Sequence, residues 1–143
     1  MKLWTIGYEA RTQGEVIGRL KAAGVERLVD VRAVAASRRA GFSKTVLGAS
    51  LEAEGIEYLH LRALGTPKAG RDAARAGRPK EMEAIYADHL AEPAAQLELG
   101  RLRELAAERK TALLCYEADP GHCHRTILAR ELASEDGFEV VDL

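Results

Sequence analysis

Side chains that could perform chemistry concentrate in one stretch of the chain, residues 111–130. The stretch holds both cysteines of the protein, two of its four histidines, two carboxylates and an arginine that follows them closely. These residues are Cys115, Cys123, His122, His124, Glu117, Asp119 and Arg125. Thiolates are nucleophiles, whereas carboxylates and imidazoles transfer protons. The stretch therefore predicts nucleophilic chemistry assisted by acid–base groups.

The local pattern indicates how these groups are positioned. Residues 112–116 form an apolar run typical of a buried strand, which ends in a polar loop and enters a helix near His122. Open α/β sheets bind ligands where a strand ends and a helix begins. The free N–H groups of a helix start favour an anion or a thiolate. We therefore expect the functional site at this junction.

Each cysteine has a reactive and an inert interpretation. Cys115 ends the strand, as a thiolate stabilised by the helix start and by Arg125 or as a small buried hydrophobe. Cys123 is the second candidate nucleophile and is expected to be the more accessible one, with helix packing as its alternative. Glu117 or His124 would move protons, and Glu117 could instead be a structural partner of an arginine.

A second group of residues could bind an anion. The segment after residue 31 is basic, with four Lys or Arg and no acid over residues 32–44, and residues 62–80 hold six basic residues against one Asp. Guanidinium groups match phosphate geometry. An ion pair between Asp30 and an arginine beneath the site is the alternative use of Arg32. The candidate anion-binding residues are Tyr8, Asp30, Arg32, Ser37, Arg38 and Arg125.

Metal and cofactor sites are not predicted. Thiolates and imidazoles are zinc ligands, but the chain has no C-x-x-C or H-x-x-x-H pair, and residues 122–124 are adjacent. The phosphate-binding patterns G-x-x-x-x-G-K-[ST] and G-x-G-x-x-G are also missing, which argues against nucleoside triphosphatases and dinucleotide oxidoreductases. We predict no metal and no cofactor, with a zinc site formed by Cys115, His122, Cys123 and His124 as the less favoured alternative.

Length and composition are those of one globular domain. The chain has 143 residues, 47% hydrophobic and 30% charged, with a net charge of −1, so we expect a single domain over residues 1–143. No run approaches the roughly 20 apolar residues of a membrane helix, and the start lacks a signal-peptide pattern. We expect a cytoplasmic protein with reduced thiols, and a Cys115–Cys123 bridge as the redox alternative.

Strand-like and helix-like segments alternate along the chain. Apolar runs predict strands at residues 2–6, 25–31, 56–61, 112–116 and 138–141. Amphipathic segments between them predict helices, the first capped by Thr12 and Glu15. Residues 64–80 are expected to be mobile, with one weak helical turn. The order predicts an α/β fold: a three-layer single domain with a mainly parallel five-stranded sheet flanked by helices.

These segments resemble a known family, domain-of-unknown-function family 488 (DUF488). The similarity rests on TIGYE at 5–9, LVDVRAVAASRRAGF at 28–42, IEYLHLRALG at 56–65 and LLCYEADPGHCHRTILA at 113–129. The family pattern has proline where this chain has Val34. The resemblance implies a fold and a set of motif positions but no reaction. Those positions are Asp30, Arg32, Ser37, Arg38, Cys115, Glu117, Cys123, His124 and Arg125.

A fainter resemblance is to rhodaneses, carried by LVDVR at 28–32 and by the strand, cysteine and helix order after residue 112. It implies sulfur transfer on a strand-end cysteine. The loop between Cys115 and Arg125 is longer than the rhodanese cradle, so sulfur transfer is the weakest of three functions. The first is an enzyme acting on a small anionic substrate, phosphorylated or nucleotide-like. The second is a non-catalytic module that binds an anion or nucleic acid.

Overall fold

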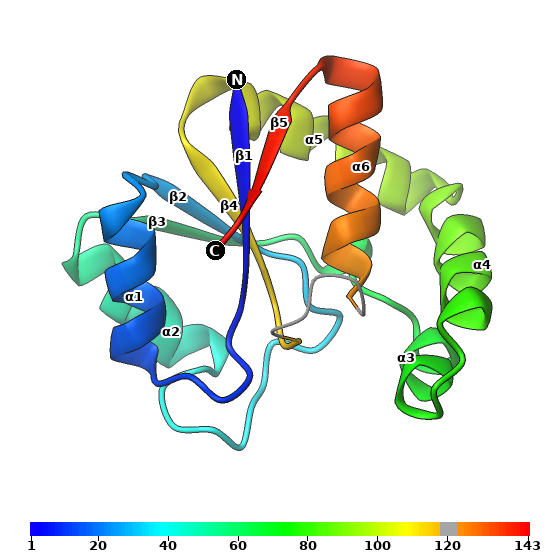
Figure 1. Cartoon of the computed structure of the whole chain (residues 1–143), viewed down its shortest axis with the longest axis horizontal. Helices are drawn as coiled ribbons and strands as arrows, with labels where there is room; N and C mark the ends of the chain where they lie inside the picture. The colour runs from blue at the N-terminus through cyan, green and yellow to red at the C-terminus, as the bar shows by residue number, and fades with distance from the viewer. Residues whose placement is uncertain (118–122) are drawn as a thin grey trace.

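The computed structural model describes residues 1–117 and 123–143 (Figure 1). The strands in this part of the chain are β1 (Lys2–Gly7), β2 (Arg27–Asp30), β3 (Glu57–His60), β4 (Thr111–Cys115) and β5 (Glu139–Asp142). The helices are α1 (Gln13–Ala22), α2 (Lys44–Ala53), the 3-10 helix η1 (Arg62–Leu64), α3 (Lys68–Arg75), α4 (Pro79–Leu90), α5 (Pro93–Glu108) and α6 (His124–Asp136). None of these helices is long and apolar enough to cross a membrane.

The strands form one sheet in the order β3-β2-β4-β1-β5. Every pairing is parallel, including β1 with β4, in which Gly7 lies opposite Cys115. The predicted α/β class and parallel five-stranded sheet are confirmed. Because parallel strands need crossover connections, helices must cover both faces of such a sheet.

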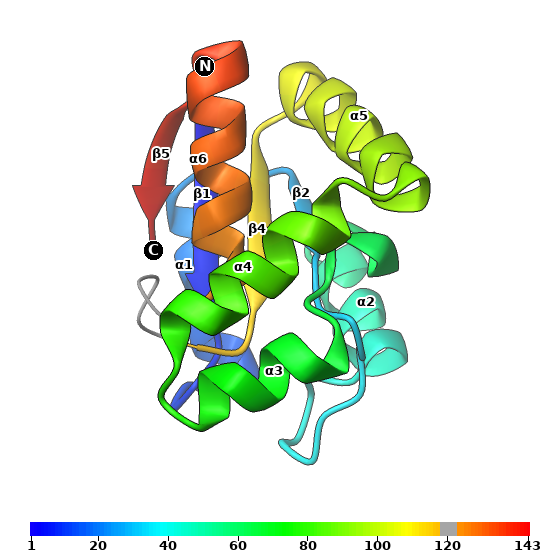
Figure 2. The ribbon, with the colours of Figure 1, turned by 90° about the vertical axis from the view of Figure 1, so that its right-hand side faces the viewer.

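Two apolar cores, one on each face of the sheet, hold the layers together. Along β4, Leu113 belongs to the core shared with α4, α5 and α6, whereas its neighbours Ala112 and Leu114 belong to the core shared with α1 and α2. This alternation is the period of two expected of a strand. Figures 1 and 2 show α1 and α2 on one side of the sheet and α3 to α6 on the other. The result is the predicted three-layer arrangement.

Residues 64–80 differ from expectation, because they contain the two-turn helix α3 in place of a mobile segment. Ala73 of α3 is buried in the core, and Arg71 Nη1 donates a hydrogen bond to the carbonyl of Thr66 at 2.9 Å. The burial of Ala73 therefore stabilises a helix of eight residues that is too short to be stable in isolation.

The final helix begins at His124, later than expected, because Cys123 has extended backbone angles and is its N-cap. His122, the expected start, and Asp119 lie outside the described residues. Since all strands are parallel, the carboxyl ends of β1, β2 and β4 meet at the same edge of the sheet, beside the start of α6.

The capping box predicted at the start of α1 is present. Glu15 N donates to Thr12 Oγ1 at 3.1 Å, and Thr12 N donates to Glu15 Oε1 at 3.2 Å. We expect Thr12→Ala to lower the free energy of unfolding by about 1 kcal/mol, because an N-terminal N–H loses its acceptor. Urea unfolding measures the change. The matched control is Thr45→Ala in α2, an exposed position where the same substitution should be neutral or slightly stabilising.

Candidate functional site

A cavity of about 500 Å³ opens at the carboxyl edge of the sheet. Its walls come from the segments after β1, β2 and β4, from α3 and α4, and from the start of α6. Six of the residues predicted from the sequence line it: Tyr8, Arg32, Cys115, Glu117, Cys123 and His124. The tertiary structure therefore brings most of the candidate residues to one place.

Arg125 lies against the sulfur of Cys115 at the base of this site. It is the second residue of α6, is 1% exposed, and donates from Nη1 to Cys115 Sγ at 3.0 Å and to the Glu117 carbonyl at 2.5 Å. A guanidinium at this distance favours a thiolate over a thiol at Cys115 when the sulfur is reduced. Arg125 therefore acts on the sulfur, and it is not among the residues that line the cavity.

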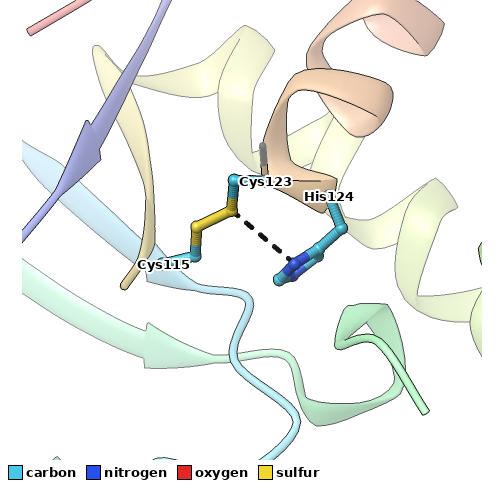
Figure 3. A group of neighbouring side chains, drawn as sticks. All are labelled: Cys115, Cys123 and His124. Carbon is cyan, nitrogen blue, oxygen red and sulfur yellow. Dashed lines mark hydrogen bonds between the residues drawn. A yellow bond between two sulfur atoms is a disulfide. The ribbon is translucent and has the colours of Figure 1, made fainter. Parts of the chain in front are cut away.

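The two cysteines are joined in a disulfide, which Figure 3 shows beside His124. The expectation of two reduced thiols is therefore wrong for this structure, and the redox alternative is the one observed. Cys123 was expected to be accessible but is only 3% exposed. The reason is that the N-cap of α6 packs directly beside the end of β4, so both sulfurs lie in the same buried place.

Glu117 places a carboxylate beside the sulfurs. Its Oε2 lies 3.5 Å from Cys115 Sγ. Burial raises the pKa of Glu117, an effect that the positive charge of Arg125 partly offsets. A raised pKa suits a carboxyl group that holds a proton and delivers it to a leaving group.

His124 faces the sulfurs with one ring nitrogen and the backbone with the other. Nε2 lies 2.7 Å from the Val31 carbonyl oxygen, and Nδ1 lies 3.7 Å from Cys123 Sγ. A carbonyl can only accept, so Nε2 carries the hydrogen. Burial lowers the pKa of His124 to about 4, which keeps the ring neutral near pH 7 and leaves the Nδ1 lone pair directed at the sulfurs.

Arg32 is engaged by Asp30. Nη2 of Arg32 and Oδ2 of Asp30 are 2.6 Å apart, both residues are buried, and Nη1 of Arg32 donates to Tyr8 Oη and to the Phe42 carbonyl. The ion pair considered as the alternative for Arg32 is thus present. Its hydrogen bonds brace the cavity wall, and Tyr58 Oη donates a further hydrogen bond to Asp30.

Ser37 and Arg38 are not among the residues that line the cavity. Ser37 Oγ accepts a hydrogen bond from the backbone N–H of Arg39, and the Ser37 N–H donates to Ser43 Oγ. Arg38 is exposed. These contacts shape the loop between β2 and α2, and neither side chain contributes to the cavity wall.

Two arginines that line the cavity, Arg71 and Arg75 of α3, were not singled out in the sequence. Thr66 and Met82 also contribute to the wall. The basic run over residues 62–80 is the sequence feature that could have identified Arg71 and Arg75. Only a helix, however, places every fourth residue of that run on the same side. A segment expected to be mobile gave no reason to choose these two.

The sequence of this chain matches the model of one known protein family. The model of the family described as "Domain of unknown function DUF488" matches residues 12–132, which is most of the chain. The chain belongs to the DUF488 family. No curated protein and no solved structure matches it significantly. The residues that match the DUF488 model run from α1 through most of α6. The match confirms the resemblance drawn from the motifs.

The structure gives physical roles to the DUF488 motif positions in this chain. Asp30 and Arg32 pair with each other, whereas Cys115 and Arg125 meet at the sulfur. The segment IEYLHLRALG at 56–65, which carries part of the resemblance, ends in Gly65, where an added Cβ would overlap with the backbone of Ala33. In this DUF488 protein, some motif residues therefore stabilise the cavity wall, and others place a cysteine and an arginine at its base.

Proposed function

We propose that this DUF488 protein is a thiol-dependent enzyme that acts on a small anionic substrate, with Cys115 as the nucleophile of the reduced protein. The observation that carries the proposal is the 3.0 Å contact between Arg125 Nη1 and Cys115 Sγ at the base of the cavity. This contact favours the thiolate, which is the reactive form of cysteine.

The cavity walls support an anionic substrate. Arg71 and Arg75 line it, and the only carboxylate in its lining, among the described residues, is Glu117. Guanidinium groups provide paired donors to oxyanions. The substrate class is therefore a small molecule with a carboxylate, phosphate or similar group at one end and an electrophilic atom at the other.

The proposed reaction proceeds by bond exchange at the sulfur. The Cys115 thiolate donates an electron pair to the electrophilic atom, a bond to the leaving group breaks, and protonated Glu117 supplies the proton that the leaving group needs. Water then attacks the transferred group, the bond from that group to Cys115 Sγ breaks, and the Glu117 carboxylate takes the proton of the water, which restores the thiolate. Oxidation of the two thiols by an oxidant such as a peroxide, which accepts their two electrons and two protons, closes the bridge to Cys123 and ends this reactivity. An external dithiol must then return two electrons and two protons to restore the two thiols.

The test compares two alkylating reagents of similar size, iodoacetate and iodoacetamide, which differ in charge. The full-length protein is reduced with a phosphine and kept free of metal ions, and mass spectrometry assigns the modified cysteine. We expect Cys115 to react first, and to prefer iodoacetate more strongly than glutathione does. Alkylation of Cys123 alone, or no preference for the anion, would overturn the proposal.

The cationic wall has its own expected outcome. Arg75→Gln and Arg71→Gln should each lower the iodoacetate preference by about two- to fivefold, because a charge near the reagent is worth on the order of 1 kcal/mol in a solvated site. The matched control is Arg19→Gln on α1, an exposed arginine that is not part of the cavity wall. It changes the net charge equally and should leave the preference unaltered.

A further inference from the structure

Three donor atoms of the site converge more closely than the sequence spacing suggested. The Sγ atoms of Cys115 and Cys123 and a ring nitrogen of His124 all lie within 4.8 Å of one another (Figure 3). It is the only group of three or more potential metal ligands found in the described residues. Adjacent residues can share this place because Cys123 is an extended N-cap and His124 is the first helical residue.

We propose that the reduced protein binds one zinc ion through Cys115 Sγ, Cys123 Sγ and His124 Nδ1. This site is separate from the proposed thiol chemistry, because zinc bound to both sulfurs would prevent their alkylation. Two thiolates with one imidazole and an open fourth position form a donor set that zinc accepts. The ion replaces two thiol protons and undergoes no redox change.

The distances fit a tetrahedral ion. With bonds of about 2.3 Å to sulfur and about 2.0–2.1 Å to nitrogen, a sulfur and a nitrogen on one zinc ion are about 3.6 Å apart. Cys123 Sγ and His124 Nδ1 are 3.7 Å apart. The carboxylate of Glu117 lies 3.5 Å from Cys115 Sγ but is not part of this donor group. Reduction must first break the bond between the sulfurs, and the sulfurs must separate before the three donors can surround an ion.

The backbone spacing also suits a metal between the sulfurs. The Cα atoms of Cys115 and Cys123 are 7.2 Å apart, whereas disulfides usually span about 4.4–6.8 Å. Two sulfurs on one tetrahedral zinc ion are about 3.8 Å apart. A bridge through a metal is longer than a direct bond, so it accommodates the observed positions of β4 and α6.

Neighbouring groups orient the ligands as they do in zinc proteins. His124 Nε2 bonds the Val31 carbonyl at 2.7 Å, which directs the Nδ1 lone pair toward the sulfurs, and a backbone carbonyl is a common partner of a metal-bound histidine. Arg125 donates to Cys115 Sγ. Zinc with two thiolates carries no net charge, so this guanidinium is not repelled and its hydrogen bond supports the thiolate.

The experiment titrates the full-length protein with Co²⁺ and then with Zn²⁺, after reduction with a phosphine and removal of metal by a chelator. We expect one Co²⁺ per chain with an intense thiolate-to-cobalt charge-transfer band, and stoichiometric displacement by Zn²⁺. Absence of the band, or zinc uptake that persists in the Cys115→Ser/Cys123→Ser double variant, would overturn the inference. The wild-type result alone is decisive if a variant fails to fold.

Variants show which side chains hold the ion. Cys115→Ser and Cys123→Ser should each weaken zinc binding by at least about 100-fold, and His124→Gln by about 10- to 100-fold. The control is His89→Gln, whose ring nitrogen also lies 2.7 Å from a carbonyl, that of Ala63, but which belongs to no such cluster. Its affinity should equal that of wild type, and an equal loss in His89→Gln and His124→Gln would contradict the assignment.

The two proposals can fail separately. Alkylation is measured without metal, so an iodoacetate preference at Cys115 with no zinc uptake rejects the zinc site and retains the thiol enzyme. Zinc uptake without the iodoacetate preference rejects the thiol enzyme and retains the zinc site.

Discussion

Replacing Asp30 with asparagine is expected to lower the free energy of unfolding by about 3 to 5 kcal/mol. Asp30 is fully buried, and its carboxylate accepts hydrogen bonds from the Arg32 guanidinium, the Arg32 backbone N–H and Tyr58 Oη. Asparagine keeps the shape but removes the charge, so the buried guanidinium loses its compensation, and an uncompensated buried charge costs this much. Urea unfolding monitored by circular dichroism measures the loss.

The control for Asp30→Asn is Glu54→Gln, which removes one charge from the Lys21–Glu54 ion pair. That pair has a similar distance, 2.7 Å, but its side chains are 53% and 45% exposed. Solvent screening makes such pairs worth less than about 1 kcal/mol. Equal losses in the two variants would show that the Asp30–Arg32 pair contributes no more than a surface ion pair, and that the cavity wall has other support.

The substitution Gly65→Ala should destabilise the protein by at least about 2 kcal/mol, because it overpacks a site with no room. Gly65 has φ −77°, so alanine fits its backbone angles. A Cβ there would nevertheless overlap with the backbone N and Cα of Ala33. Backbone cannot rotate away as a side chain can, so the loop that follows Arg32 must move. Urea unfolding again measures the change.

The control for Gly65→Ala is Gly18→Ala in the exposed part of α1, where an added Cβ meets nothing within 4 Å. Alanine should stabilise this helix by about 0.5–1 kcal/mol. The same substitution thus has opposite expected signs at the two positions. A Gly65→Ala variant as stable as wild type would mean that the η1 region and the loop after β2 adjust without cost.

Local pattern was enough to predict the layers and the sheet. The apolar run in β4 and the capping box at Thr12 and Glu15 are short-range features. Each determines the structure of its own segment. Parallel order followed from strands that alternate with helices. Helix α3 was missed because eight residues are too few for a stable isolated helix, so its stability depends on the burial of Ala73 in the core.

The sequence by itself determined which residues are reactive, that they follow a strand and precede a helix, and that the sheet edge collects them. Only the tertiary structure decided how their side chains are used. Arg32 is engaged by Asp30, α3 brings Arg71 to the cavity, and His124 directs Nδ1 at the sulfurs because Val31 holds Nε2. Side-chain direction depends on contacts between segments far apart in the chain, and no local pattern encodes those contacts.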